Sequence, residues 1–99
     1  MVNRSELVPT AFKELPDITG IRIYTFETNT KYKKRDDLLV VVFDKGTVAA
    51  GVYTSSLCPS APVEWCKESV NYNKIRGLVV NSGNANAFTG KRGVQTVNN

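Results

Sequence analysis

The stretch "VVNSGNANAFTGKRG", residues 79–93, holds the residue types that could do chemistry. Two valines end an apolar run, and a serine, three glycines and three asparagines follow, with Phe88 as the bulky hydrophobic side chain among them. Loops carry function more often than strands do, but Asn and Gly are also ordinary turn formers. The composition is therefore compatible with a plain strand-to-helix turn or with a functional loop, and three kinds of functional loop are considered below.

A phosphate-binding loop is the first kind of site to consider. A P-loop needs the pattern GxxxxGK followed by Ser or Thr. Here six residues separate Gly83 from Gly90, and Arg92 follows "GK". Both the spacing and the missing hydroxyl exclude a P-loop.

Nucleic-acid binding is the second alternative. "GKRG", residues 90–93, fits the Gly-x-x-Gly loop with which KH modules clamp a nucleic-acid backbone. "KYKKR", residues 31–35, adds a second cationic stretch, although a charged turn is more often only a solvated hairpin tip. A KH loop joins two helices, whereas a strand and an Asn-rich loop precede this one. A non-catalytic basic RNA-binding module stays open as an alternative.

An oxyanion hole is the third alternative. Anionic intermediates of acyl transfer need preorganised hydrogen-bond donors and no competing bulk. The stretch leaves a strand and enters a predicted helix N-terminus, where free backbone N–H groups and the positive end of the helix dipole favour an anion. Gly90 has no Cβ, so a substrate could approach its N–H closely, and Thr89 offers an O–H donor beside it.

Composition limits the possible mechanisms. The 99 residues are 41% hydrophobic and carry a net charge of +4, which fits one small, mildly basic domain. The chain has no histidine, so it can build neither a Ser-His nor a Cys-His nucleophile pair, and another base must serve in any enzyme. Cys58 and Cys66 are too few for a Cys/His zinc site, and we expect them to be reduced thiols.

The elements that must position the loop can be predicted from hydrophobic patterning. "LLVVVF" has no polar alternation and predicts a strand buried on both faces. We expect it to form a hairpin with a second strand across the "DKG" turn. The predicted strands are residues 21–28, 38–43, 47–54 and 75–80, with the hairpin over 38–54.

A change of period after the third predicted strand predicts a helix. Ser60 could cap it, and Pro62 would stand in its first turn, where the missing N–H costs little. Strands and helix together predict an α/β (α+β) fold with a mixed sheet and packed helices. No internal boundary is visible, so we expect residues 1–99 to form a single, partial domain.

The hydrophobic pattern of the sequence shows neither a signal peptide nor a membrane-spanning segment. The longest apolar run is "LLVVVF", far below the ~20 residues that span a bilayer. The first residues show no signal-peptide core. We therefore expect a cytoplasmic protein without a membrane partner.

"VVNSGNANAFTG" closely resembles the signature of the ornithine acetyltransferase family, also called bifunctional glutamate N-acetyltransferase, of arginine biosynthesis. The resemblance extends over residues 8–95 and includes "AAGVYT" and "APVEW". The departure is "SSLCPSAPV", where most members have Asn and basic residues before "AAPV".

The resemblance implies a mechanism. Members cut themselves before an internal threonine, whose new amine can serve as base while its hydroxyl takes the acetyl group from N-acetylornithine and passes it to glutamate. The Thr-Gly pair that forms the oxyanion hole corresponds here to Thr89 and Gly90. The other matching residues would shape the loop: Asn81, Ser82, Gly83, Asn84 and Asn86.

The resemblance also implies partners. This chain would be an N-terminal fragment, the first half of an α chain, and the nucleophile would lie outside it, so we expect it to be inactive alone. Its partners would be the remainder of the α chain and the β chain, in a hetero-oligomer, with no nucleic acid. No bound cofactor is expected, and some members accept acetyl-CoA as acetyl donor. A self-cleaving acyltransferase or amidohydrolase with another substrate is the enzymatic alternative.

Overall fold

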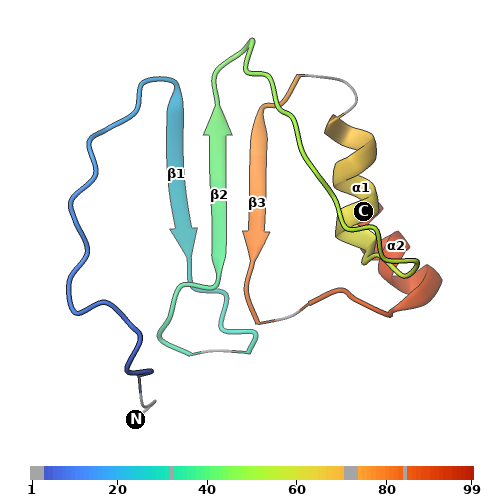
Figure 1. Cartoon of the computed structure of the whole chain (residues 1–99), viewed down its shortest axis with the longest axis horizontal. Coiled ribbons are helices and arrows are strands. Elements are labelled where there is room, and N and C mark those ends of the chain that lie inside the picture. The colour runs from blue at the N-terminus through green and yellow to red at the C-terminus, as the bar shows by residue number, and fades with distance from the viewer. Residues whose placement is uncertain (1–3, 32, 71–73, 84) are drawn as a thin grey trace.

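The computed structural model describes residues 4–31, 33–70, 74–83 and 85–99. It places a sheet on one side of the molecule and a pair of helices on the other (Figure 1). The elements in chain order are β1 (Ile21–Phe26), β2 (Leu38–Phe43), α1 (Ala61–Val70), β3 (Gly77–Asn81) and α2 (Gly90–Asn98).

The sheet has the order β1-β2-β3, with β2 in the centre. Its apolar, largely β-branched sequence suits a central strand because both of its faces can be covered. Both pairings are antiparallel, with Ile23 opposite Val41 in one and Val41 opposite Leu78 in the other. The predicted α/β (α+β) fold class is confirmed, although the sheet of the described residues is antiparallel rather than mixed.

The predicted hairpin over residues 38–54 is wrong. The hairpin in the structure joins β1 to β2 through the charged turn, and β3 occupies the other edge of β2. Residues 47–54 form no strand. Small residues there favour a coil, and Tyr53 folds back over Gly51, where a Cβ would lie 2.7 Å from the Tyr53 hydroxyl. The Tyr53 hydroxyl donates instead to the Cys66 carbonyl of α1 at 3.4 Å.

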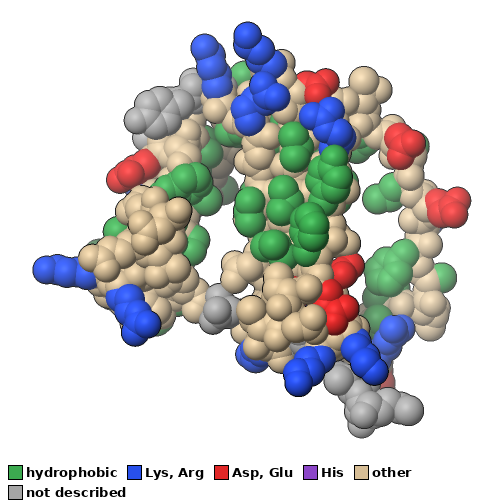
Figure 2. Space-filling model, turned by 180° about the vertical axis from the view of Figure 1, so that it is seen from behind, with side chains coloured by type: hydrophobic (Ala, Val, Ile, Leu, Met, Phe, Trp, Pro, Cys, Tyr) green, Lys and Arg blue, Asp and Glu red, His purple; other side chains and the backbone are tan. Residues whose placement is uncertain are grey.

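The predicted burial of the strands is also wrong for this chain. Val41 is the one buried hydrophobic residue in the described ranges, and β3 is exposed along its whole length. The Cα radius of gyration is 16.2 Å, against about 13 Å for a compact domain of this length. Figure 2 shows hydrophobic side chains gathered over the sheet, in the open. The strands are exposed because neither face of the sheet is covered by another layer of secondary structure.

The two helices pack against each other beyond the β3 edge (Figure 1). As predicted, α1 begins after Ser60, whose carbonyl accepts from the N–H groups of Val63 at 3.0 Å and Glu64 at 3.2 Å. Pro62 lies in the first turn. Within the described ranges, no helix has the length and apolarity needed to cross a bilayer.

The exposed sheet generates a prediction for the 99-residue chain in isolation. Its open apolar surface should bind the dye ANS, and its heat-capacity trace should lack a sharp unfolding peak, because little area is buried to make folding cooperative. Dye fluorescence and calorimetry measure both. A sharp transition without dye binding would contradict this account.

Candidate oxyanion-binding site

The predicted loop begins at a junction of three backbone segments. β3 ends at Asn81, and the next N–H, that of Ser82, donates to the Asp37 carbonyl at 2.8 Å. The Asp37 N–H donates to the Phe26 carbonyl at 3.0 Å. The peptide groups of Asp37 therefore hold the end of β1 and the start of the loop to the beginning of β2.

The Asp37 side chain strengthens this junction. It is 5% exposed, and its carboxylate accepts from the Thr28 N–H at 2.8 Å, the Thr28 hydroxyl at 2.6 Å and the Thr30 hydroxyl at 3.3 Å. The hydroxyl and N–H of Thr28 lower the pKa of Asp37 below its usual value, with Thr30 adding to them, because they stabilise the charged form. The carboxylate is thus saturated and structural.

Sequence reasoning missed Asp37, because it considered the charged stretch at residues 31–35 only as a cationic patch or a solvated hairpin tip and assigned no role to the residues that follow it. The available signal was an Asp directly before an apolar run, preceded by the polar "TNT". Short polar side chains of this kind often hydrogen-bond nearby backbone groups. A small pocket of about 190 Å³ adjoins the junction, and Asn81 and Ser82 help to line it.

The loop ends where α2 begins. Thr89 is the N-cap residue of α2, and Gly90 is its first residue. Gly90 has a φ of +61°, a left-handed conformation that favours glycine, and a Cβ there would meet nothing within 4 Å. Both residues are exposed. The first N–H groups of a helix have no intrahelical acceptor, so an open, electropositive end lies at the predicted pair.

A hydrogen-bonded cluster of Asn86, Thr89 and Gly93 holds this end. The Thr89 hydroxyl donates to Asn86 Oδ1, and Asn86 Nδ2 donates to the Gly93 carbonyl at 2.9 Å. Gly93 is buried because these side chains lie on it. A Cβ at Gly93 would overlap Thr89 Oγ1 and lie 2.5 Å from Asn86 Oδ1.

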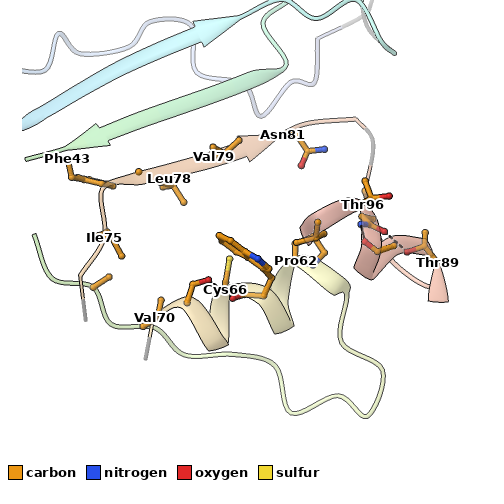
Figure 3. A pocket seen from close by; sticks show the side chains of 18 of the residues that line it. Phe43, Pro62, Cys66, Val70, Ile75, Leu78, Val79, Asn81, Thr89 and Thr96 are labelled. Atoms are coloured by element: carbon orange, nitrogen blue, oxygen red, sulfur yellow. Dashed lines mark hydrogen bonds between the residues drawn. The ribbon is translucent and has the colours of Figure 1, made fainter. Parts of the chain in front are cut away.

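Thr89 faces a broad groove between the β3 edge and the helices (Figure 3). The groove has a volume of about 1240 Å³ and is lined mainly by apolar side chains. Leu78 projects from β3 and Cys66 from α1 toward each other across it. Asn86, Thr89 and Thr96 give one end of the groove a polar character.

The structure separates the other predicted residues. Asn81 ends β3, and Ser82 is tied to Asp37, whereas Gly83 lies in the following bend. Asn84 lies outside the described residues. Among the other loop-shaping residues, Asn86 therefore reaches Thr89, and Asn81 and Ser82 belong to the opposite end of the loop.

The structure does not provide the geometry that the alternative sites, a nucleic-acid-binding loop and a metal site, would need in the described residues. "GKRG" lies in the first turn of α2 rather than in a loop between two helices. Cys58 and Cys66 are free thiols. In the ranges that the structure describes, no group of His, Cys, Asp and Glu side chains could hold a metal ion.

Comparison with known proteins bears on the same region. Residues 22–99 match the ArgJ family. The chain is 58% identical over 93 residues to the arginine biosynthesis bifunctional protein ArgJ of Bartonella henselae, covering 94% of this chain and 23% of that protein. It is 56% identical over 89 residues to the protein of the same name from Bradyrhizobium diazoefficiens, covering 90% of this chain and 22% of that protein. The chain thus spans about a quarter of the length of these relatives.

A solved structure agrees with the fold. The crystal structure of the arginine biosynthesis bifunctional protein ArgJ from Bacillus halodurans matches 78% of this chain and 40% of that chain. The TM-score is 0.70 and the sequence identity 37%. The family resemblance predicted from the signature is confirmed.

The packing at Gly93 predicts an unusual effect of alanine. Replacing a glycine inside a helix by alanine normally stabilises it by about 1 kcal/mol. Here Gly93→Ala should destabilise by about 1–3 kcal/mol, because the new methyl group overlaps Thr89 and Asn86. The host is a full-length chimera that carries this chain in place of the matching segment of the Bartonella henselae relative. Chemical denaturation measures the change, and Gln95→Ala on the same helix is the control. Stabilisation by Gly93→Ala would contradict the described packing.

The Asp37 junction predicts a pH dependence. Because the pKa of Asp37 is lowered in the folded state, the stability it adds is complete above the usual carboxyl pKa of about 4 and is lost as the pH falls through the lowered value. Asp37→Asn should therefore destabilise the full-length chimera most above about pH 5, and the difference from the parent should shrink below about pH 3.5.

Denaturant titrations at several pH values measure this difference. The matched control is Asp36→Asn, since the exposed Asp36 accepts from the Thr25 hydroxyl at 2.8 Å. An Asp37→Asn effect that is independent of pH would show that the charge of Asp37 does not strengthen the junction.

Proposed function

Because the chain belongs to the ArgJ family, we propose that it is the part of an arginine-biosynthetic acetyltransferase that stabilises the oxyanion. The reaction moves an acetyl group from N-acetylornithine to glutamate, and some members of the family also accept acetyl-CoA as acetyl donor. The support is the family membership together with the "NSGNANAFTG" signature at the start of α2.

The observation that carries the proposal is the open N-terminus of α2 beside the groove. The Gly90 N–H belongs to the first turn, and no Cβ hinders an approaching oxygen. Such N–H groups and the helix dipole stabilise negative charge that develops on a carbonyl oxygen. Gly90 therefore acts through its backbone.

Thr89 acts through its hydroxyl group. In the resting structure this hydroxyl donates to the neutral amide oxygen of Asn86. An oxyanion is a stronger acceptor than an amide oxygen, because hydrogen bonds to charged groups are about twice as strong. The proton can therefore turn to the oxyanion as charge develops, which strengthens the bond in the transition state.

The nucleophile comes from outside this chain. It is the N-terminal threonine of the β chain, and its own amine takes the proton, as the family resemblance implies. N-acetylornithine gives its acetyl group to that threonine hydroxyl and leaves as ornithine, and glutamate then takes the acetyl group from the threonine ester.

The exposed sheet is the surface that the rest of the enzyme covers. Ile23 and Val79 are each 65% exposed, on opposite faces of the sheet by the strand register. Contiguous apolar surface of this kind marks an interface. We assign it to the remainder of the α chain and to the β chain, which together form a hetero-oligomer in the cytoplasm.

The experiment is an acetyl-transfer assay of the full-length chimera, from N-acetylornithine to glutamate. The parent chimera should be active, and Thr89→Ala should lower kcat by about 10²–10³, the cost of losing one oxyanion donor. Thr47→Val is the control, because the Thr47 hydroxyl donates to the Asp44 carbonyl at 2.8 Å in a turn remote from α2. An inactive parent chimera, or a folded Thr89→Ala variant within about threefold of it, would overturn the proposal.

A further inference from the structure

The Thr89 side chain does not make the capping hydrogen bond that its N-cap position favours. A threonine at an N-cap typically accepts a hydrogen bond from the N–H of the second or third helical residue. In α2 these residues are Lys91 and Arg92, yet Thr89 makes no side-chain cap. Another hydrogen bond keeps its hydroxyl off these N–H groups.

Asn86 holds it. The Gly93 carbonyl can only accept, so Asn86 must turn its amide nitrogen toward it, and the distance from Nδ2 is 2.9 Å. The orientation of the amide is therefore fixed, and Oδ1 must face the Thr89 hydroxyl. The hydroxyl group has to donate to Asn86, because Oδ1 has no proton to offer.

Gly93 makes this arrangement possible. With no Cβ, it lets Asn86 and Thr89 lie directly on the backbone of the helix. Asn86 is half-buried there, whereas Thr89 is exposed toward the groove. Asn86 is thus fixed to the helix backbone, and Thr89 is the member of the pair that is accessible from the groove.

We propose that Asn86 is a positioning residue for the oxyanion hole, which it keeps open by holding the Thr89 hydroxyl in a hydrogen bond and so off the free N–H groups of Lys91 and Arg92. This rests on the proposed function. Without Asn86, Thr89 would turn to the N–H of Lys91 or Arg92 as an ordinary N-cap. Its oxygen would then accept from the first-turn N–H groups in place of the substrate oxyanion, and the hydroxyl would leave the position from which its proton can turn to that oxyanion.

Kinetics of the full-length chimera test this role. Asn86→Ala should lower kcat about tenfold or more, part of the ~10²–10³ that loss of one donor costs, and leave KM within about twofold. In a Thr89→Val background, which has no hydroxyl to turn, Asn86→Ala should change kcat less than about twofold. Asn98→Ala, at the exposed end of the same helix, is the control.

The two backgrounds separate positioning from simple structural damage. A merely structural role would lower activity equally in both, and equal losses would overturn the proposal. So would an Asn86→Ala variant that keeps its kcat within about twofold. Chemical denaturation should show little loss of stability, because the new cap offsets the lost hydrogen bonds.

A crystal structure of the Asn86→Ala chimera gives a readout that needs no activity. It should show Thr89 Oγ1 within hydrogen-bond distance of the N–H of Lys91 or Arg92. Thr89 still turned away from the first turn would overturn the inference, even if the enzyme is active. An inactive parent chimera would instead defeat the proposed function, and the orientation of Thr89 would still decide the role of Asn86.

Discussion

The hydrogen bonds of Asp37 are the constraint on which the rest of the arrangement depends. Its peptide groups join the end of β1 and the residue after β3 to the start of β2, and Thr28 and Thr30 saturate its carboxylate. The loop that carries the family signature therefore leaves the sheet from a fixed point. Because the other end of the loop is fixed by Asn86 and Gly93, Thr89 and Gly90 are presented from a loop that is tied at both ends.

The open sheet and the open groove have one cause. We attribute both to the proposed assignment, in which the rest of an enzyme about four times this length covers both sheet faces and the space beside β3. On this assignment, the apolar residues that are exposed in the structure face the rest of the enzyme. Local hydrogen bonding, rather than a large core, determines the geometry of the candidate site within the described residues.

The sequence predicted those elements of secondary structure that depend on local patterning. The strand at Ile21–Phe26, the helix after Ser60 and a helix beginning near Gly90 follow from patterning and capping. The charged turn was treated as a hairpin tip, which agrees with the pairing of β1 and β2. The second partner of β2 was mispredicted as residues 47–54, because which strand reaches that edge depends on tertiary packing, and β3 occupies it. Asp37 was missed because its donors come from another part of the turn. The roles of Thr89 and Gly90 came from the family signature, and the tie to Asn86 required coordinates.

The central claim is that the N-terminus of α2 receives the oxygen of the transferred acetyl group. A crystal structure of the full-length chimera trapped as its acetyl-enzyme tests it most directly. The account predicts the acetyl carbonyl oxygen about 2.7–3.1 Å from the Gly90 nitrogen, the distance expected of an oxyanion donor. An acetyl oxygen bound by other donors, with Gly90 out of reach, would contradict the claim.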